Sequence, residues 1–129
     1  MAFTLSIIDE TASGNRWSAG DFRFDAEILP LRELIRRRVQ QEVERFNQSD
    51  IEPFRGLIEP EATERILNGV RERPVLDEEK QYAKAIGSFQ GNGFLVLVDD
   101  RQITDLDDNV RLTADTKVTF LKLVPLVGG

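Results

Sequence analysis

The sequence contains no cysteine and no histidine. The first absence excludes a thiol nucleophile, a disulfide framework and zinc–thiolate sites, and the second excludes imidazole as a general base. Carboxylate pairs remain available for acid–base chemistry, but the two absences together make an enzyme the less favoured expectation. We therefore expect a protein that is not an enzyme and that holds no metal and no cofactor of its own.

Long apolar runs are also missing, since no stretch approaches the ~20 residues that span a membrane. The opening stretch, MAFTLSIIDE, has no basic region followed by an apolar one, so no signal peptide is expected. The net charge of −6 argues against broad nucleic-acid binding and suits a basic partner surface. We expect a single cytoplasmic domain over residues 1–129, with no nucleic-acid or membrane partner.

Two alternating stretches near the start predict a hairpin. The first, FTLSIIDE at residues 3–10, alternates with a period of two, as a half-buried strand does. The second, FRFDAEIL at residues 22–29, alternates again, and its predicted inner side is formed by Phe22, Phe24, Ala26 and Ile28. The stretch between them, TASGNRWSAGD, is rich in turn formers and is expected to be a long loop.

The stretch LRELIRRRVQQEVERF, residues 31–46, predicts a long amphipathic helix directly after Pro30, which suits a first helical turn. The apolar positions recur with helical spacing, at Leu31, Leu34, Ile35, Val39, Val43 and Phe46. Arg36, Arg37 and Arg38 are interpreted as a solvated helix face offset by nearby glutamates, in preference to a nucleic-acid site.

Residues 48–93 predict helical structure packed on the rest of the domain. The stretch EPEATERILNGVRER, residues 59–73, indicates a short helix that ends before Pro74. A second helix is expected in DEEKQYAKAIGSF, with Asp77 as N-cap and with QGNG after its end. We expect its apolar stripe to be buried, namely Tyr82, Ala85, Ile86 and Phe89.

The last third favours strands. FLVLVDD, residues 94–100, is typical of a strand buried on both faces, and a turn and the short stretch QITDL follow it. DDNVRLTADT is polar and typical of turns, and KVTFLKLVPLV predicts the final strand. Pro125 cannot donate to a sheet ladder, so pairing should fail near it and residues 125–129 should project as a flexible tail.

This order of a hairpin, a long helix, a buried strand, a short strand and a final strand resembles that of ubiquitin-like β-grasp proteins. The residues that carry the resemblance are the helix quoted above, FLVLVDDRQITDLDDNVRL, and DTKVTFLKLVPLVGG. The ending P-x-x-G-G is especially similar to that of small prokaryotic sulfur carriers of molybdopterin and thiamine synthesis. The resemblance covers residues 1–47 and 94–129. It implies an α+β fold, a mixed sheet packed on one long helix, with residues 48–93 as an extra helical insertion before the third strand.

The resemblance also implies a chemistry for the terminal pair Gly128–Gly129. A partner enzyme would use ATP to convert the Gly129 carboxylate into an acyl adenylate. A thiol would then accept the acyl group as a thioester, or a sulfur donor would convert it into a thiocarboxylate. Glycine suits a tail that must enter a narrow channel, because it has no side chain to collide with the walls. The domain would position the carboxylate and supply no catalytic side chain. We expect activation without prior proteolytic processing.

The end of the chain carries more large apolar side chains than one strand face can bury. Leu121 and Leu123 are therefore candidates for either the core or a partner interface. Beyond them, Pro125, Leu126 and Val127 are expected to contact the activating enzyme.

Three functions remain open at this point. The first is a protein modifier whose C-terminus forms an isopeptide bond with a lysine of a target protein. Its partners would be an activating enzyme, a conjugating enzyme and a deconjugating metalloprotease. The extra length of residues 48–93 favours this function. The second is a sulfur carrier for cofactor or tRNA thiolation, which the ending PLVGG favours. The third is a β-grasp binding module in which the glycines are incidental.

Overall fold

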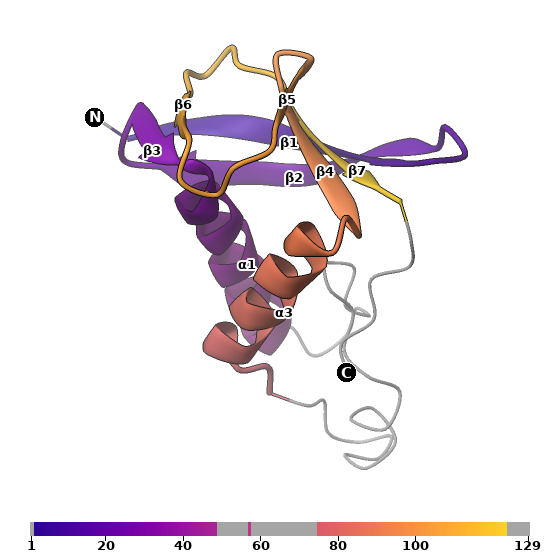
Figure 1. Cartoon of the computed structure of the whole chain (residues 1–129). Coiled ribbons are helices and arrows are strands. Elements are labelled where there is room, and N and C mark those ends of the chain that lie inside the picture. The colour runs from indigo at the N-terminus through magenta and orange to yellow at the C-terminus, as the bar shows by residue number, and fades with distance from the viewer. Residues whose placement is uncertain (1, 49–56, 58–74, 124–129) are drawn as a thin grey trace.

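The computed structural model describes residues 2–48, 57 and 75–123 and shows an α+β fold (Figure 1). A five-stranded mixed sheet has the strand order β2-β1-β7-β4-β5, and a separate two-stranded sheet pairs β3 with β6. The elements are β1 (Phe3–Thr11), β2 (Arg16–Phe24), β3 (Ile28–Pro30), α1 (Leu31–Gln48), α3 (Glu78–Gln90), β4 (Phe94–Val98), β5 (Arg101–Ile103), β6 (Asn109–Arg111) and β7 (Val118–Lys122).

The two strands at the heart of the sheet come from opposite ends of the described chain. β1 pairs in parallel with β7, and its other edge pairs antiparallel with β2. β4 pairs antiparallel with both β7 and β5. Because β1 and β7 run side by side, the last described strand lies in the middle of the sheet.

The predicted opening hairpin is confirmed, but its loop is much shorter than expected. β2 begins at Arg16, so most of the stretch 11–21 is strand, and the turn covers only residues 12–15. Gly14 takes a φ of +95° in that turn, which glycine adopts without steric strain. The second glycine, Gly20, belongs to a β-bulge opposite Ile7 and Ile8 rather than to the turn.

The expectation that Ala26 and Ile28 continue the inner side of β2 is wrong, since both are exposed. β2 ends at Phe24, and residues 25–27 lead the chain into β3, where the side facing the core is reset. Leu29 is buried in that strand instead of Ile28.

The expectation that β4 is buried on both faces is also wrong. Phe94, Val96 and Val98 are buried, whereas Leu95 and Leu97 are only partly buried. The reason is that both helices lie on the same face of the sheet (Figure 1). The turn after β4 is a two-residue hairpin in which Asp99 and Asp100 both have positive φ.

The polar stretch 107–116 contains a short strand that the sequence pattern does not predict. β6 pairs antiparallel with β3, and the side chain of Val110 is buried between polar neighbours. Leu112, directly after this strand, is fully buried, and its N–H donates to the carbonyl of Glu27. The two short strands thus close the end of the core beside the start of α1.

Both helices follow their sequence pattern closely. α1 buries every apolar position predicted for its inner face, which packs on the sheet. In α3, the Asp77 carboxylate accepts from the N–H groups of Glu79 and Lys80, which confirms the predicted N-cap. Ala85 and Phe89 are buried, while Tyr82 and Ile86 are partly buried against the core. The helix predicted within residues 59–73 lies outside the described residues.

Candidate functional site

The described base of the tail is the end of β7. Leu121 pairs with Glu10 of β1 and Leu95 of β4, on the sheet face opposite to the buried Phe120. Leu123 is 38% exposed, and its N–H donates to the carbonyl of Gly93 at 2.9 Å. The other predicted site residues lie outside the described residues, namely Pro125, Leu126, Val127, Gly128 and Gly129.

Leu121 belongs to an apolar surface on the sheet face that α1 and α3 leave uncovered (Figure 1). Register places Ile8, Leu95, Leu97 and Leu121 on this face around the buried Thr119, and we call these four residues the sheet patch. All four are partly buried. An ion pair between Arg16 and Glu10, with Nε and Oε1 at 3.1 Å, borders the patch. The structure thus places Leu121 in a surface patch, with Leu123 exposed at the strand end.

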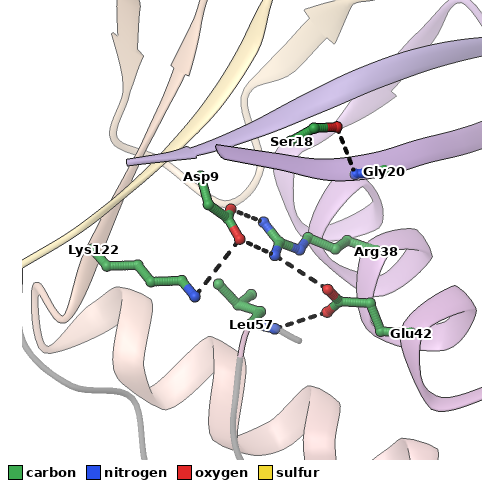
Figure 2. Close-up of polar contacts among 7 residues, drawn as sticks. All are labelled: Asp9, Ser18, Gly20, Arg38, Glu42, Leu57 and Lys122. Atoms are coloured by element: carbon green, nitrogen blue, oxygen red, sulfur yellow. Dashed lines mark hydrogen bonds and ion pairs between the residues drawn. The ribbon is translucent and has the colours of Figure 1, made fainter. Parts of the chain in front are cut away.

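A cluster of four charged side chains lies near the end of β7, on the sheet face that the helices cover (Figure 2). Arg38 of α1 and Asp9 of β1 are fully buried and form a bidentate pair, with Nη1–Oδ1 and Nη2–Oδ2 distances of 2.5 and 2.7 Å. The Arg38 Nη2 also donates to Glu42 at 3.2 Å, and the Lys122 ammonium lies 3.6 Å from Asp9 Oδ2. Two cations and two anions therefore meet in what we call the charged cluster.

The balance of charge keeps Arg38 ionised in a dry site. Burial by itself lowers the pKa of the guanidinium, but the carboxylates of Glu42 and Asp9 outweigh it and raise the pKa above its ordinary value. The guanidinium also lies 4.6 Å from the centroid of the Phe120 ring, which adds a cation–π contact. Arg38 is therefore a permanent positive charge around which the other three groups are arranged.

The charged cluster joins parts of the chain that are far apart in sequence. It links β1 through Asp9, α1 through Arg38 and Glu42, and β7 through Lys122. The remaining Glu42 oxygen, Oε1, accepts from the N–H of Leu57 at 2.9 Å, so Leu57 is held to the same group (Figure 2). Two buried polar atoms of the described residues, Arg38 Nε and Gln81 Oε1, have no hydrogen-bond partner.

Lys122 has a second contact that reaches the surface. Its ammonium lies 5.5 Å from the centroid of the Trp17 ring, and Trp17 is 42% exposed. The last residue of β7 is thus held between a buried carboxylate and an aromatic ring of β2. This arrangement anchors the last residue of β7.

The expectation that Arg36, Arg37 and Arg38 form one solvated helix face is wrong for Arg38. Arg36 pairs with Glu79 of α3 at 2.9 Å, and Arg37 is partly exposed near Glu33 and Asp25. Two signals in the sequence point to a buried Arg38. It follows Leu34 and Ile35 on the inner face of the helix, and Asp9 continues the inner side of Leu5 and Ile7.

Within residues 2–48, 57 and 75–123, no group of three or more acidic side chains is placed to hold a metal ion. None of the helices that the structure describes is both long and apolar enough to cross a membrane. What the geometry provides is a firmly anchored central strand with an apolar surface beside its end.

Comparisons with known proteins identify no relative. No protein-family model matches the chain, and neither a curated protein nor a solved structure matches it.

Proposed function

We propose that this protein is a ubiquitin-like β-grasp modifier that is activated at Gly129 and conjugated to target proteins. The observation that carries the proposal is the strand order β2-β1-β7-β4-β5, with β1 parallel to β7 and α1 across one face. This order is compatible with a β-grasp fold. It places the final strand in the sheet centre, and PLVGG follows that strand in the sequence.

In the proposed reaction the domain only binds the partner enzymes and positions the carboxylate of Gly129. A Gly129 carboxylate oxygen attacks the α-phosphorus of ATP on the activating enzyme, and pyrophosphate leaves. A thiolate of the enzyme then attacks the acyl carbon, and AMP leaves as the thioester forms. The amine of a target lysine finally displaces the thiol, which gives an isopeptide bond. Every catalytic group belongs to the partners, which include a conjugating enzyme and a deconjugating metalloprotease.

The anchoring of β7 supports this role, because positioning is the contribution that the domain has to make. Lys122 is held by Asp9 and Trp17, and the Leu123 N–H by Gly93. Beyond Leu123, six residues reach Gly129, and a fully extended segment of that length spans about 20–22 Å. Such a tail can enter a recessed active site while the domain rests on the surface of the enzyme.

The sheet patch supplies the docking surface in this proposal. Its partly buried side chains lie on the uncovered sheet face, and Leu121 joins it to the base of the tail. Apolar surface of this kind gains free energy on leaving water, at about 25 cal/mol per Å² of area removed. We propose that Leu121 and Leu123 contact the activating enzyme, followed by Pro125, Leu126 and Val127.

The sequence makes the conjugate directly recognisable by mass spectrometry. Trypsin cleaves after Lys122, and residues 123–129 contain no further lysine or arginine. A modified lysine would therefore carry the remnant LVPLVGG. We expect tryptic peptides with this branch when the full chain is expressed in its native cells, and none when a Gly129 deletion variant is expressed.

A sulfur carrier is the second candidate, and the ending P-x-x-G-G favours it. In that case Gly129 would become a thiocarboxylate, and the intact mass would rise by the difference between sulfur and oxygen. Finding this form without any LVPLVGG remnant would replace the modifier with the carrier. Finding neither product would leave a β-grasp binding module and would overturn the proposal.

A further inference from the structure

The outer edge of β2 is covered by side chains of α1. β2 is the edge strand of the five-stranded sheet, so the backbone groups on its outer side have no neighbouring strand among the described residues. Exposed edges of this kind are templates for pairing with another chain. In this protein the carbonyl of Asp21 and the N–H of Arg23 bond to side chains of α1 instead.

Gln41 occupies the edge as a piece of backbone would. Its amide Nε2 donates to the carbonyl of Asp21 at 2.7 Å, and its Oε1 accepts from the N–H of Arg23 at 3.1 Å. One amide group thus satisfies a carbonyl and an N–H two residues apart, which is the pattern that a residue of a parallel neighbouring strand provides.

Arg45 completes the cover one helical turn later. Its Nη2 donates to the same Asp21 carbonyl at 2.6 Å, so both lone pairs of that oxygen are used. Gly20 suits this position, because its φ of +112° is one that other residues rarely adopt and because a Cβ there would lie 2.9 Å from Arg45 Nη1. The N–H of Gly20 donates to the Ser18 hydroxyl at 3.1 Å (Figure 2). The β-bulge at this position further disrupts the edge.

We propose that Gln41 and Arg45 form a lock that prevents β2 from pairing with the β2 of a second copy of this chain. A second copy is the natural occupant, because two identical edges brought together around a two-fold axis are complementary to each other. Hydrogen bonds from the side chains to the edge replace those that an added strand would make. The lock is independent of the proposed activation of Gly129.

The test compares two double variants by size-exclusion chromatography with light scattering over a range of concentrations. Q41A/R45A opens the edge, and Q40A/E44A changes the same number of residues on the same helix without touching β2. We expect the opened variant to form dimers as its concentration rises, and the wild type and the control to stay monomeric. A folded Q41A/R45A that remains monomeric at every concentration would overturn the proposal.

Two further measurements separate edge pairing from non-specific aggregation. Arg23→Pro removes the outward N–H, and proline is tolerated on an edge strand, so the triple variant Q41A/R45A/R23P should return to the monomer. Hydrogen exchange of the Arg23 amide in the wild type gives an answer even if the opened variant fails to fold. We expect that amide to be protected by Gln41. Exchange as fast as that of an exposed loop amide would contradict the lock, as would dimers that persist in the triple variant.

Discussion

At the scale of single residues, the buried guanidinium of Arg38 makes the largest contribution that we expect from the charged cluster to the free energy of unfolding. Removing one partner of a buried ion pair leaves an uncompensated charge in a dry site, which is far more costly than losing a surface pair. Arg38 and its neighbour Arg37 allow this contrast to be measured on one helix. Arg38 is fully buried with Asp9, whereas the Arg37 side chain is 39% exposed, with its nearest carboxylate oxygen 3.6 Å away.

We predict that R38M lowers the free energy of unfolding by about 3–5 kcal/mol, the range for breaking a buried pair. R37M is the matched control and should cost at most about 1 kcal/mol. Urea denaturation followed by circular dichroism measures both. Equal costs for the two variants would mean that the charged cluster does not hold the sheet and helix together.

The neighbouring carboxylate gives a second check on the same pair. R38M leaves the carboxylates of Asp9 and Glu42 without Arg38, and D9N removes the charge of Asp9, so D9N/R38M should cost less than the sum of the two single variants. Such non-additivity is the mark of residues in direct contact. If the two costs add, the pairing of Asp9 with Arg38 contributes nothing of its own to stability.

At the scale of elements, several kinds of contact hold α3 on the core. Its start is fixed twice, by the Asp77 cap and by Asn47, whose side chain bonds both the N–H and the carbonyl of Leu76 at 2.9 and 3.1 Å. Its body is fixed by Ala85 and Phe89, and the Arg36 guanidinium lies 3.9 Å from the centroid of the Tyr82 ring. The Asp77 cap, the hydrogen bonds of Asn47 and the apolar contacts together hold this helix beside α1.

We predict that D77A lowers the free energy of unfolding by about 1 kcal/mol, the usual effect of losing an N-cap. K80A, on the exposed side of the same turn, should cost almost nothing.

F89A should cost about 3–5 kcal/mol, as for a buried aromatic side chain. I86A should cost less, because Ile86 is only partly buried. Thermal and urea unfolding give these values. A negligible cost for F89A would show that α3 is loosely attached.

The elements also show what the sequence pattern can and cannot predict. α1, α3 and β1 have strong periods of 3.6 or two, whereas β4 and β7 lie in largely apolar stretches, and these patterns predict all five elements. It misses the start of β2 because turn-forming residues dominate that stretch, although Gly20 serves a bulge and an arginine contact there. It misses β6 because that strand has three residues and pairs with β3, far away in the sequence, so no local period indicates it.

The candidate site is predictable only where it depends on local sequence. Leu121 and Leu123 follow from the excess of apolar residues at the end of β7. The charged cluster cannot be predicted in this way, because Asp9, the partner of Arg38, lies 29 residues away in β1. The local sequence pattern around either residue does not indicate such a contact. The signal for such a pair is a charge on the inner face of a helix together with a carboxylate on the inner side of a strand.

At the scale of the whole molecule, the described fold holds its last strand at the centre of the five-stranded sheet. β7 is flanked by β1 and β4, and the charged cluster fixes its end to α1. The helices occupy one sheet face, and the sheet patch lies on the other, where we propose that a partner binds. In the proposed function, one protein thus supplies a docking surface and an anchored tail, and all chemistry takes place at Gly129.

The most direct test of this function is ATP–pyrophosphate exchange with the cognate activating enzyme. The purified chain ending at Gly129 should support exchange without any protease, because the carboxylate of Gly129 is the proposed acceptor of AMP. Deleting Gly129, or changing Gly128 to Trp, should abolish exchange while the circular dichroism spectrum and unfolding transition stay unchanged. Exchange that is undiminished in the Gly129 deletion variant would contradict activation at this residue and, with it, both the modifier and the sulfur carrier.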